Sequence, residues 1–138
     1  MADHLLDSGI LVHHLRNYPA YVALTNRLAE LGQLYIATFT RFEIMRGMRQ
    51  HENEGTYRLV DSMVNLPMNM AVADLAGELV RTWQTRGIVL GEGDAIIAAT
   101  ALCFDLELVT TNGRHFPMPE LNVWQADEEG KITLKGNP

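Results

Sequence analysis

Three carboxylates stand where elements of the predicted fold begin or end, and their side chains could together bind a metal ion. Asp7 follows the short apolar run over residues 5–6, Glu43 lies in the first turns of a predicted helix, and Asp94 opens a nearly continuous apolar helix. Carboxylate oxygens are the ligands that Mg²⁺ and Mn²⁺ prefer. Such an ion can polarise a phosphoryl oxygen and lower the pKa of a bound water. Hydrolysis of a phosphodiester is therefore the chemistry that these residues predict.

Each carboxylate also has a purely structural explanation. The spacing of Thr40 and Glu43 fits a capping box, Asp94 fits a helix N-cap or a first-turn acid, and Asp7 fits an Asx turn. For any one of them alone, capping is the more common role. Together, three like charges at one sheet edge would raise one another's pKa and destabilise the fold. A bound divalent cation would remove that penalty.

Short apolar runs alternate with helical patterns along the chain, which predicts an α/β fold around a parallel sheet. We expect strands over residues 5–7, 34–37, 107–111 and 121–124, and helices over 10–15, 19–31, 38–50, 57–66, 71–86 and 94–102. Ligands of such sheets bind beyond the carboxyl ends of the strands, where the three acids fall. Residues 1–126 are expected to form one domain, and the polar residues 127–138 a tail or a loose hairpin.

Composition limits the class of protein. The chain has 138 residues and 47% hydrophobic residues, enough for one domain with a real core. Its net charge of −6 argues against a broad basic surface for nucleic acid, although nine of its eleven cations are arginine, which grips phosphate well. No apolar run approaches the roughly 18 residues of a membrane span. Cys103 is the only cysteine, which suggests a reducing cytoplasm, and we expect it to be a small core residue.

Four segments, taken in order, resemble the PIN-domain family, and within it the VapC-type toxins of toxin–antitoxin pairs. Residues 5–12 are similar to the family's opening "LLDTN" strand, with Ser8 and Gly9 at its last two positions. Residues 36–47 resemble the segment with the second acid, including the Arg46-Gly47 pair. Residues 93–102 match the family's "DALIAATAL" helix almost letter for letter, and residues 108–116 resemble its "LVTRN..DF" segment.

This resemblance implies a single domain with a short, mainly parallel sheet between two layers of helices. It also implies a metal-dependent endoribonuclease that cuts single-stranded or loop RNA with Mg²⁺ or Mn²⁺, is restrained by a cognate antitoxin and is often a homodimer. Asp7, Glu43 and Asp94 match the family's acidic ligands position by position. Ser8 matches the hydroxyl that helps to hold the first acid and a water on the metal.

One departure from the family pattern concerns a fourth acid. Many members have it at the position of Asn112 or of His115, and this chain has it at neither. Asn112 would offer a neutral carbonyl oxygen, while His115 would contact RNA, donate a proton to the leaving oxygen, or simply be a surface residue. We therefore expect one tightly held ion, with any second ion arriving with the substrate phosphate. The missing acid also favours the alternative of a catalytically weak PIN-like module that works through protein or RNA association.

Two arginines and two lysines bear on the remaining alternatives. Arg46 and Arg49 could steer RNA phosphate toward the metal, or could equally lie on a solvated helix face with Glu52 and Glu54 as partners. A receiver domain or small phosphatase would need a helper lysine late in the fold, and the two lysines of this chain lie in the predicted tail. The aromatic residues Phe42 and Trp83 are expected in helix cores rather than as platforms for bases.

Overall fold

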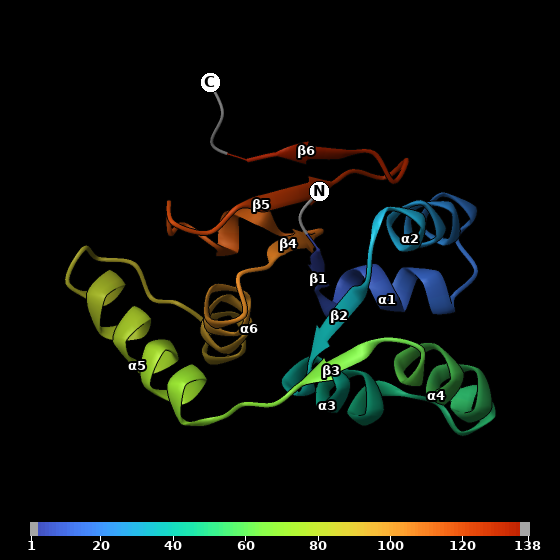
Figure 1. Ribbon diagram of the computed structural model, residues 1–138, viewed down its shortest axis with the longest axis horizontal. Coiled ribbons are helices and arrows are strands. Elements are labelled where there is room, and N and C mark those ends of the chain that lie inside the picture. Colours follow the sequence, from blue (N-terminus) through green and yellow to red (C-terminus); the bar gives the residue numbers. More distant parts are fainter. Residues whose placement is uncertain (1–2, 136–138) are drawn as a thin grey trace.

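The computed structural model describes residues 3–135 and is a three-layer α/β/α domain (Figure 1). Its strands are β1 (His4–Leu6), β2 (Leu34–Ala37), β3 (Val64–Leu66), β4 (Glu107–Thr110), β5 (Val123–Ala126) and β6 (Ile132–Leu134). Its helices are α1 (Ser8–Leu15), α2 (Pro19–Leu31), α3 (Thr38–Gly47), α4 (Asn53–Asp61), α5 (Met70–Gln84) and α6 (Glu92–Cys103). Two short 3₁₀ turns are η1 (Gln50–Glu52) and η2 (Gly113–His115). The predicted fold class is confirmed.

The order of the strands places a functional site at the middle of the sheet. The order is β3-β2-β1-β4-β5-β6, and every pair is parallel except β5 with β6. From β1 the chain moves outward to β2 and β3 and then returns to β4 on the other side of β1. Ligands of open α/β sheets bind at the carboxyl ends of the strands where the order reverses in this way. That point lies between β1 and β4.

Helices cover both faces of the sheet, and successive strand residues point to opposite faces. Neighbouring residues of one strand therefore enter two different cores. Leu5 and Leu108 belong to the core under α5 and α6, whereas Leu6 and Val109 belong to the core under α1 and α2. α6 is buried along most of its length, as its all-round apolar sequence predicts. Because α6 is packed in the core, the position of its first turn, which contains Asp94, is fixed.

Three side chains test the predicted core. Trp83 is buried in the core under α5, as expected. The expectation for Cys103 is wrong, because this residue is exposed in the last turn of α6, where the helix leaves the core. The expectation for Phe42 is also wrong, since its side chain is 54% exposed on α3.

The helix predicted over residues 57–66 is only partly correct. α4 ends at Asp61, and residues 64–66 form β3, which pairs with β2. Two local causes end the helix. Asn65 donates from Nδ2 to the carbonyls of Val60 and Met63, at 3.0 and 2.9 Å. Pro67 disfavours helical backbone at the residue before it. These contacts turn an apolar run into the edge strand of the sheet.

The segment after residue 126 forms a hairpin with the sheet, the second of the two forms that its sequence allows. β6 pairs antiparallel with β5, and the turn between them is fastened to α2 because the Tyr21 hydroxyl donates to the Asp127 carbonyl at 2.7 Å. The boundary predicted after residue 126 therefore falls at the start of this hairpin, and residues 136–138 lie outside the described residues. Within residues 3–135, no helix has the length and apolar character needed to cross a membrane.

Candidate functional site

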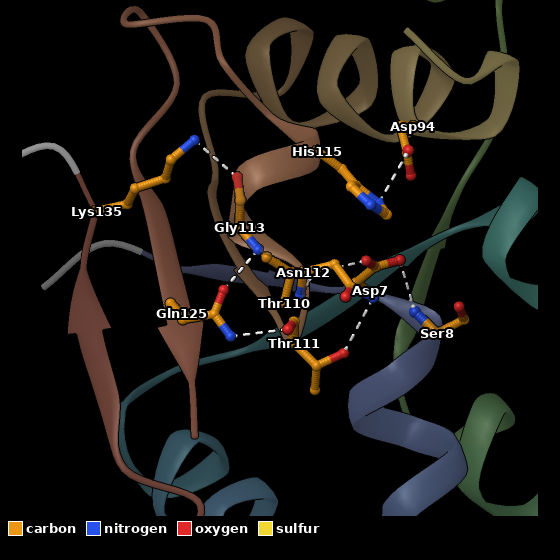
Figure 2. A network of polar contacts seen from close by, with 10 residues as sticks. All are labelled: Asp7, Ser8, Asp94, Thr110, Thr111, Asn112, Gly113, His115, Gln125 and Lys135. Carbon is orange, nitrogen blue, oxygen red and sulfur yellow. Dashed lines mark hydrogen bonds and ion pairs between the residues drawn. The ribbon is translucent and has the colours of Figure 1, made fainter. Parts of the chain in front are cut away.

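Asp7 lies at the carboxyl end of β1 and serves as the N-cap of α1. Its Oδ1 accepts a hydrogen bond from the Ser8 backbone N–H at 2.8 Å, and its Oδ2 accepts one from the Thr110 hydroxyl at 2.7 Å (Figure 2). Its own N–H donates to the Val109 carbonyl at 3.0 Å, so the residue is held between β1 and β4. Asp7 therefore has a structural role as the cap of α1, rather than in the Asx turn that its sequence context predicted. This does not exclude a ligand role, because a carboxylate has about four lone-pair directions and these two bonds use only some of them.

The environment of Asp7 opposes its negative charge. The residue is only 8% exposed, and this burial raises the pKa of its carboxyl group. The hydrogen bonds from Thr110 and Ser8 favour the charged form and offset part of that effect, as does the nearby His115. The site thus holds a carboxylate in a place where a positive charge would be favourable.

Glu43 does not cap its helix. α3 begins at Thr38 with Ala37 as its N-cap, so the capping box predicted between Thr40 and Glu43 is not formed. Among the described residues, the buried Oε1 of Glu43 has no hydrogen-bond partner. Burial is the main cause of the raised pKa of Glu43. The charge of Asp7 raises this pKa further, while Arg46 lowers it. Helix capping therefore does not explain the presence of Glu43 at this position.

Asp94 lies in the first turn of α6, whose N-cap is Gly91, so it is a first-turn acid rather than a cap. Its Oδ2 lies 3.4 Å from Nδ1 of His115, the ion pair drawn in Figure 2. Burial and the charge of Asp7 raise the pKa of Asp94, and His115 lowers it. Asp7 thus contributes to the raised pKa of both other acids, which shows that the three charges lie within electrostatic reach of one another.

A glycine brings the Asp94 end of α6 close to α3. A Cβ atom built on Gly93 would lie 2.7 Å from Cε2 of Phe39, closer than real Cβ contacts allow. The absence of a side chain at Gly93 lets the Phe39 ring lie against the first turn of α6. This contact sets the spacing between the helix that holds Glu43 and the helix that holds Asp94.

The supporting residues predicted from sequence occupy the same edge. Ser8 contributes its backbone N–H to Asp7, and η2 brings His115 to Asp94. Asn112 is exposed at the start of that turn, and its N–H donates to the Thr110 hydroxyl at 3.0 Å. Thr110 is among the polar residues that the sequence places at the end of this strand, although the predicted site gives it no role.

The two arginines of the predicted RNA contact differ in position. Arg46 stacks over the exposed Phe42 ring, at 5.2 Å from its centre, and is near enough to lower the pKa of Glu43. Arg49 lies beyond the end of α3, where its backbone N–H donates to Oε1 of Glu52 at 2.8 Å. Only Arg46 is therefore placed beside the acids.

The donor set suits a hard divalent cation, although the ligands are not gathered. Across residues 3–135, no three His, Cys, Asp or Glu side chains lie close enough together to hold a metal ion as they stand. The chemistry of the site nevertheless fits such an ion. All three acids offer oxygen, and burial raises the pKa of each. The charge of Asp7 raises the pKa of Glu43 and of Asp94 further, and Glu43 has an unpaired buried oxygen. Mg²⁺ and Mn²⁺ complete their coordination with water, so three protein ligands are sufficient.

This combination of a three-layer fold and an acidic strand edge defines a PIN-like domain, and residues 4–119 match the PIN domain family. The chain belongs to that family. Its curated relatives include Ribonuclease VapC19 of Mycobacterium tuberculosis, 35% identical over 119 residues, which are 85% of this chain and 95% of the relative. Ribonuclease VapC10 of the same organism is 36% identical over 84% of this chain and 87% of the relative. The DNA-bound VapBC structure from Salmonella typhimurium shares the fold, with a TM-score of 0.78 and 20% identity over 89% of this chain and 97% of that one.

Proposed function

We propose that this protein is a divalent-metal-dependent endoribonuclease that hydrolyses single-stranded or loop RNA, and that it is the toxin of a toxin–antitoxin pair. The observation behind the proposal is that three acids lie around the point where the strand order reverses, that the charge of Asp7 raises the pKa of Glu43 and Asp94, and that one buried oxygen of Glu43 is unpaired. The relatives named Ribonuclease VapC support RNA as the substrate. The fold alone would leave the substrate open.

In this proposal Asp7 and Asp94 hold Mg²⁺ or Mn²⁺ directly, and Glu43 holds it directly or through a water. When bound, the ion would polarise a phosphoryl oxygen and lower the pKa of a water. The Thr110 hydroxyl and the Ser8 N–H orient Asp7 and favour its ionised form, which offsets part of the effect of burial.

The remaining roles fall to exposed side chains around the acids. His115 is half exposed beside Asp94, where it can give a proton to the leaving oxygen. Asn112 offers a neutral oxygen at the same edge. Arg46 would attract RNA phosphate to the site, and Arg49, farther along the chain, would contribute less.

The test replaces one acid and compares it with an acid elsewhere. We expect Asp94→Asn to lower Mg²⁺-dependent RNA cleavage by more than about 100-fold, because losing even an indirect partner of a metal ligand costs about 10- to 100-fold. Asp74→Asn is the matched control, since Asp74 is exposed on α5. Cleavage rates of both variants would be measured with a labelled single-stranded RNA. Full activity of Asp94→Asn would contradict the assignment.

The alternative is a catalytically weak PIN-like module that acts by association. It predicts that the wild-type chain binds RNA or a protein but does not cleave RNA at any Mg²⁺ or Mn²⁺ concentration. Expression in a host separates the two readings independently. The nuclease arrests growth and Asp7→Asn relieves the arrest, whereas a binding module has the same effect with or without Asp7.

The proposed partners are a cognate antitoxin and a second copy of this chain. Solved structures with this fold include a toxin–antitoxin complex from Klebsiella pneumoniae and the DNA-bound VapBC structures of Rickettsia felis and Salmonella typhimurium. A cavity of about 150 Å³ between α1 and α3 includes Glu43 in its lining, and in this proposal a partner reaches the acid there. Co-purification with the product of the neighbouring gene, and sedimentation of the isolated chain, would test the two partners. A site of action in the cytoplasm accords with the single exposed thiol of Cys103.

A further inference from the structure

The turn that presents Asn112 and His115 has little structure of its own. η2 spans only the three residues Gly113–His115. Its internal bonds run from the His115 N–H to the Asn112 carbonyl and from the Phe116 N–H to the Gly113 carbonyl, each at 3.0 Å. Since so short a turn is held weakly by its own backbone bonds, contacts from outside must fix its position.

Gln125, on β5, supplies one set of these contacts. Its Oε1 accepts a hydrogen bond from the Gly113 N–H at 2.6 Å, and its Nε2 donates to the Thr111 carbonyl at 2.8 Å. Nε2 also donates to the Ala126 carbonyl at 2.9 Å, which ties the amide to its own strand. One side chain thus joins the sheet to the residues on both sides of Asn112.

Lys135, directly after β6, supplies the other set. Its Nζ donates to the carbonyls of Gly113 and Phe116, both at 2.8 Å, and so binds the two ends of the turn. Its backbone N–H donates to the Val123 carbonyl at 2.8 Å, which fixes the base of the side chain on the sheet. Figure 2 shows Lys135 reaching the turn from the side opposite to Asp7 and Asp94.

Gly113 fits closely between these two side chains. A Cβ atom at this position would lie 2.7 Å from Oε1 of Gln125 and 3.5 Å from Cδ of Lys135. Gly113 is buried although the residues on both sides of it in the chain are exposed. The turn is therefore seated in a cradle that Gln125 and Lys135 form.

We propose that Gln125 and Lys135 are positioning residues that hold the turn of Asn112 and His115 in register with Asp7 and Asp94. The C-terminal hairpin is then part of the site rather than an appendage. Both residues lie beyond residues 4–119, the part of the chain that matches the PIN family, so family membership assigns them no role. The consequence for RNA cleavage rests on the proposed function, whereas the consequence for the turn does not.

The hairpin contains its own control residue. Lys131 and Lys135 are the only two lysines of the chain, and both are exposed on the same hairpin. Lys135→Met and Lys131→Met each remove one positive charge from the hairpin, so Lys131→Met controls for the change in net charge. Lys135→Arg keeps several N–H donors and can still bind both carbonyls.

We expect Lys135→Met to lower kcat for RNA cleavage by about 10- to 100-fold with little change in KM, because small displacements of catalytic groups have effects of that size. Lys131→Met should cleave like the wild type, and Lys135→Arg should recover most of the lost rate. Equal rates for Lys135→Met and Lys131→Met would overturn the role in cleavage.

Amide hydrogen exchange of the protein, without RNA or metal, tests the turn itself. We expect faster exchange at residues 113–116 in Lys135→Met and in Gln125→Met, with unchanged exchange in Lys131→Met and with β1 and α6 protected in all variants. Unchanged exchange at the turn would overturn the proposal even if cleavage fell. If the wild type cleaved no RNA, the proposed function would fail, and exchange alone would still uphold or overturn the cradle.

Discussion

The buried oxygen of Glu43 makes this residue a source of instability in the protein without a metal. Burial and the charge of Asp7 raise the pKa of Glu43 above the ordinary value of 4.5. The folded state therefore binds a proton more tightly than the unfolded state does. Between the pKa of Glu43 in the unfolded state and its raised pKa in the folded state, the free energy of unfolding falls as pH rises. The cost of holding Glu43 ionised is thus fully present only above the raised pKa of the folded state.

This sign gives a prediction for Glu43→Gln. In the presence of a chelator, the variant should unfold at a higher temperature than the wild type at pH 7, and the difference should vanish toward pH 4. Mg²⁺ should raise the melting temperature of the wild type more than that of the variant. Thermal melts from pH 4 to 8 would measure both effects. The control is Glu78→Gln, an exposed acid on α5, and an equal response of the two variants would contradict the prediction.

At the scale of the residue, the positions of the acids at the sheet edge could be predicted because they stand next to recognisable local patterns. Asp7 ends an apolar run and Asp94 begins one, and the parallel sheet brings such positions to one edge. Thr110 was visible as a strand-end hydroxyl, but its bond to Asp7 joins residues 103 positions apart. The contacts of Gln125 and Lys135 with the turn go to backbone carbonyls and N–H groups, which residues of almost every type have. No pattern of residue types could therefore indicate them.

At the scale of the element, the contact between α3 and α6 at Gly93 and Phe39 controls the distance between two acids. Gly93→Ala should displace the Phe39 ring and lower the free energy of unfolding by about 1–3 kcal/mol, the usual range for overpacking. RNA cleavage should fall with it, because the first turn of α6 holds Asp94.

The matched control is Gly77→Ala on α5. A Cβ atom there meets nothing within 4 Å, so this variant should be more stable by up to about 1 kcal/mol. Chemical denaturation and the cleavage assay would compare the two. A Gly93→Ala variant that gained stability as Gly77→Ala does, with normal cleavage, would show that Phe39 moves aside without consequence.

The elements whose ends were predicted correctly have clear start and stop signals in the sequence, such as proline and glycine. α2 runs from Pro19 to Leu31, and the chain then enters β2 after Gly32, all as expected. β3 was missed because its three residues continue the apolar pattern of the preceding helix. The hydrogen bonds of Asn65 that separate the two depend on the folded backbone. A sequence pattern does not contain them.

At the scale of the whole molecule, the net charge of −6 has an uneven origin. Asp7, Glu43 and Asp94 supply three of those negative charges at one edge of the sheet, and one divalent ion would return two. The remaining charge gives no broad basic track, so attraction for RNA should come from the ion and from Arg46. Binding of RNA away from the site should accordingly be weak.

The same charge count predicts the number of metal ions. Three acids neutralise a second divalent ion less well than four would, so crystals soaked in Mn²⁺ without RNA should show one fully occupied ion by anomalous diffraction. A second ion should appear only with a substrate or a phosphate analogue. Two fully occupied ions in the free protein would contradict this prediction.

The exposed thiol of Cys103 has a practical consequence. It lies in the last turn of the same buried helix whose first turn holds Asp94. Nine helical steps separate the two residues, which is about 14 Å at 1.5 Å per residue. A fluorophore or spin label attached to this cysteine would thus report on ions and RNA that bind at the Asp94 end of α6. The native sequence already contains a single attachment point for such a probe.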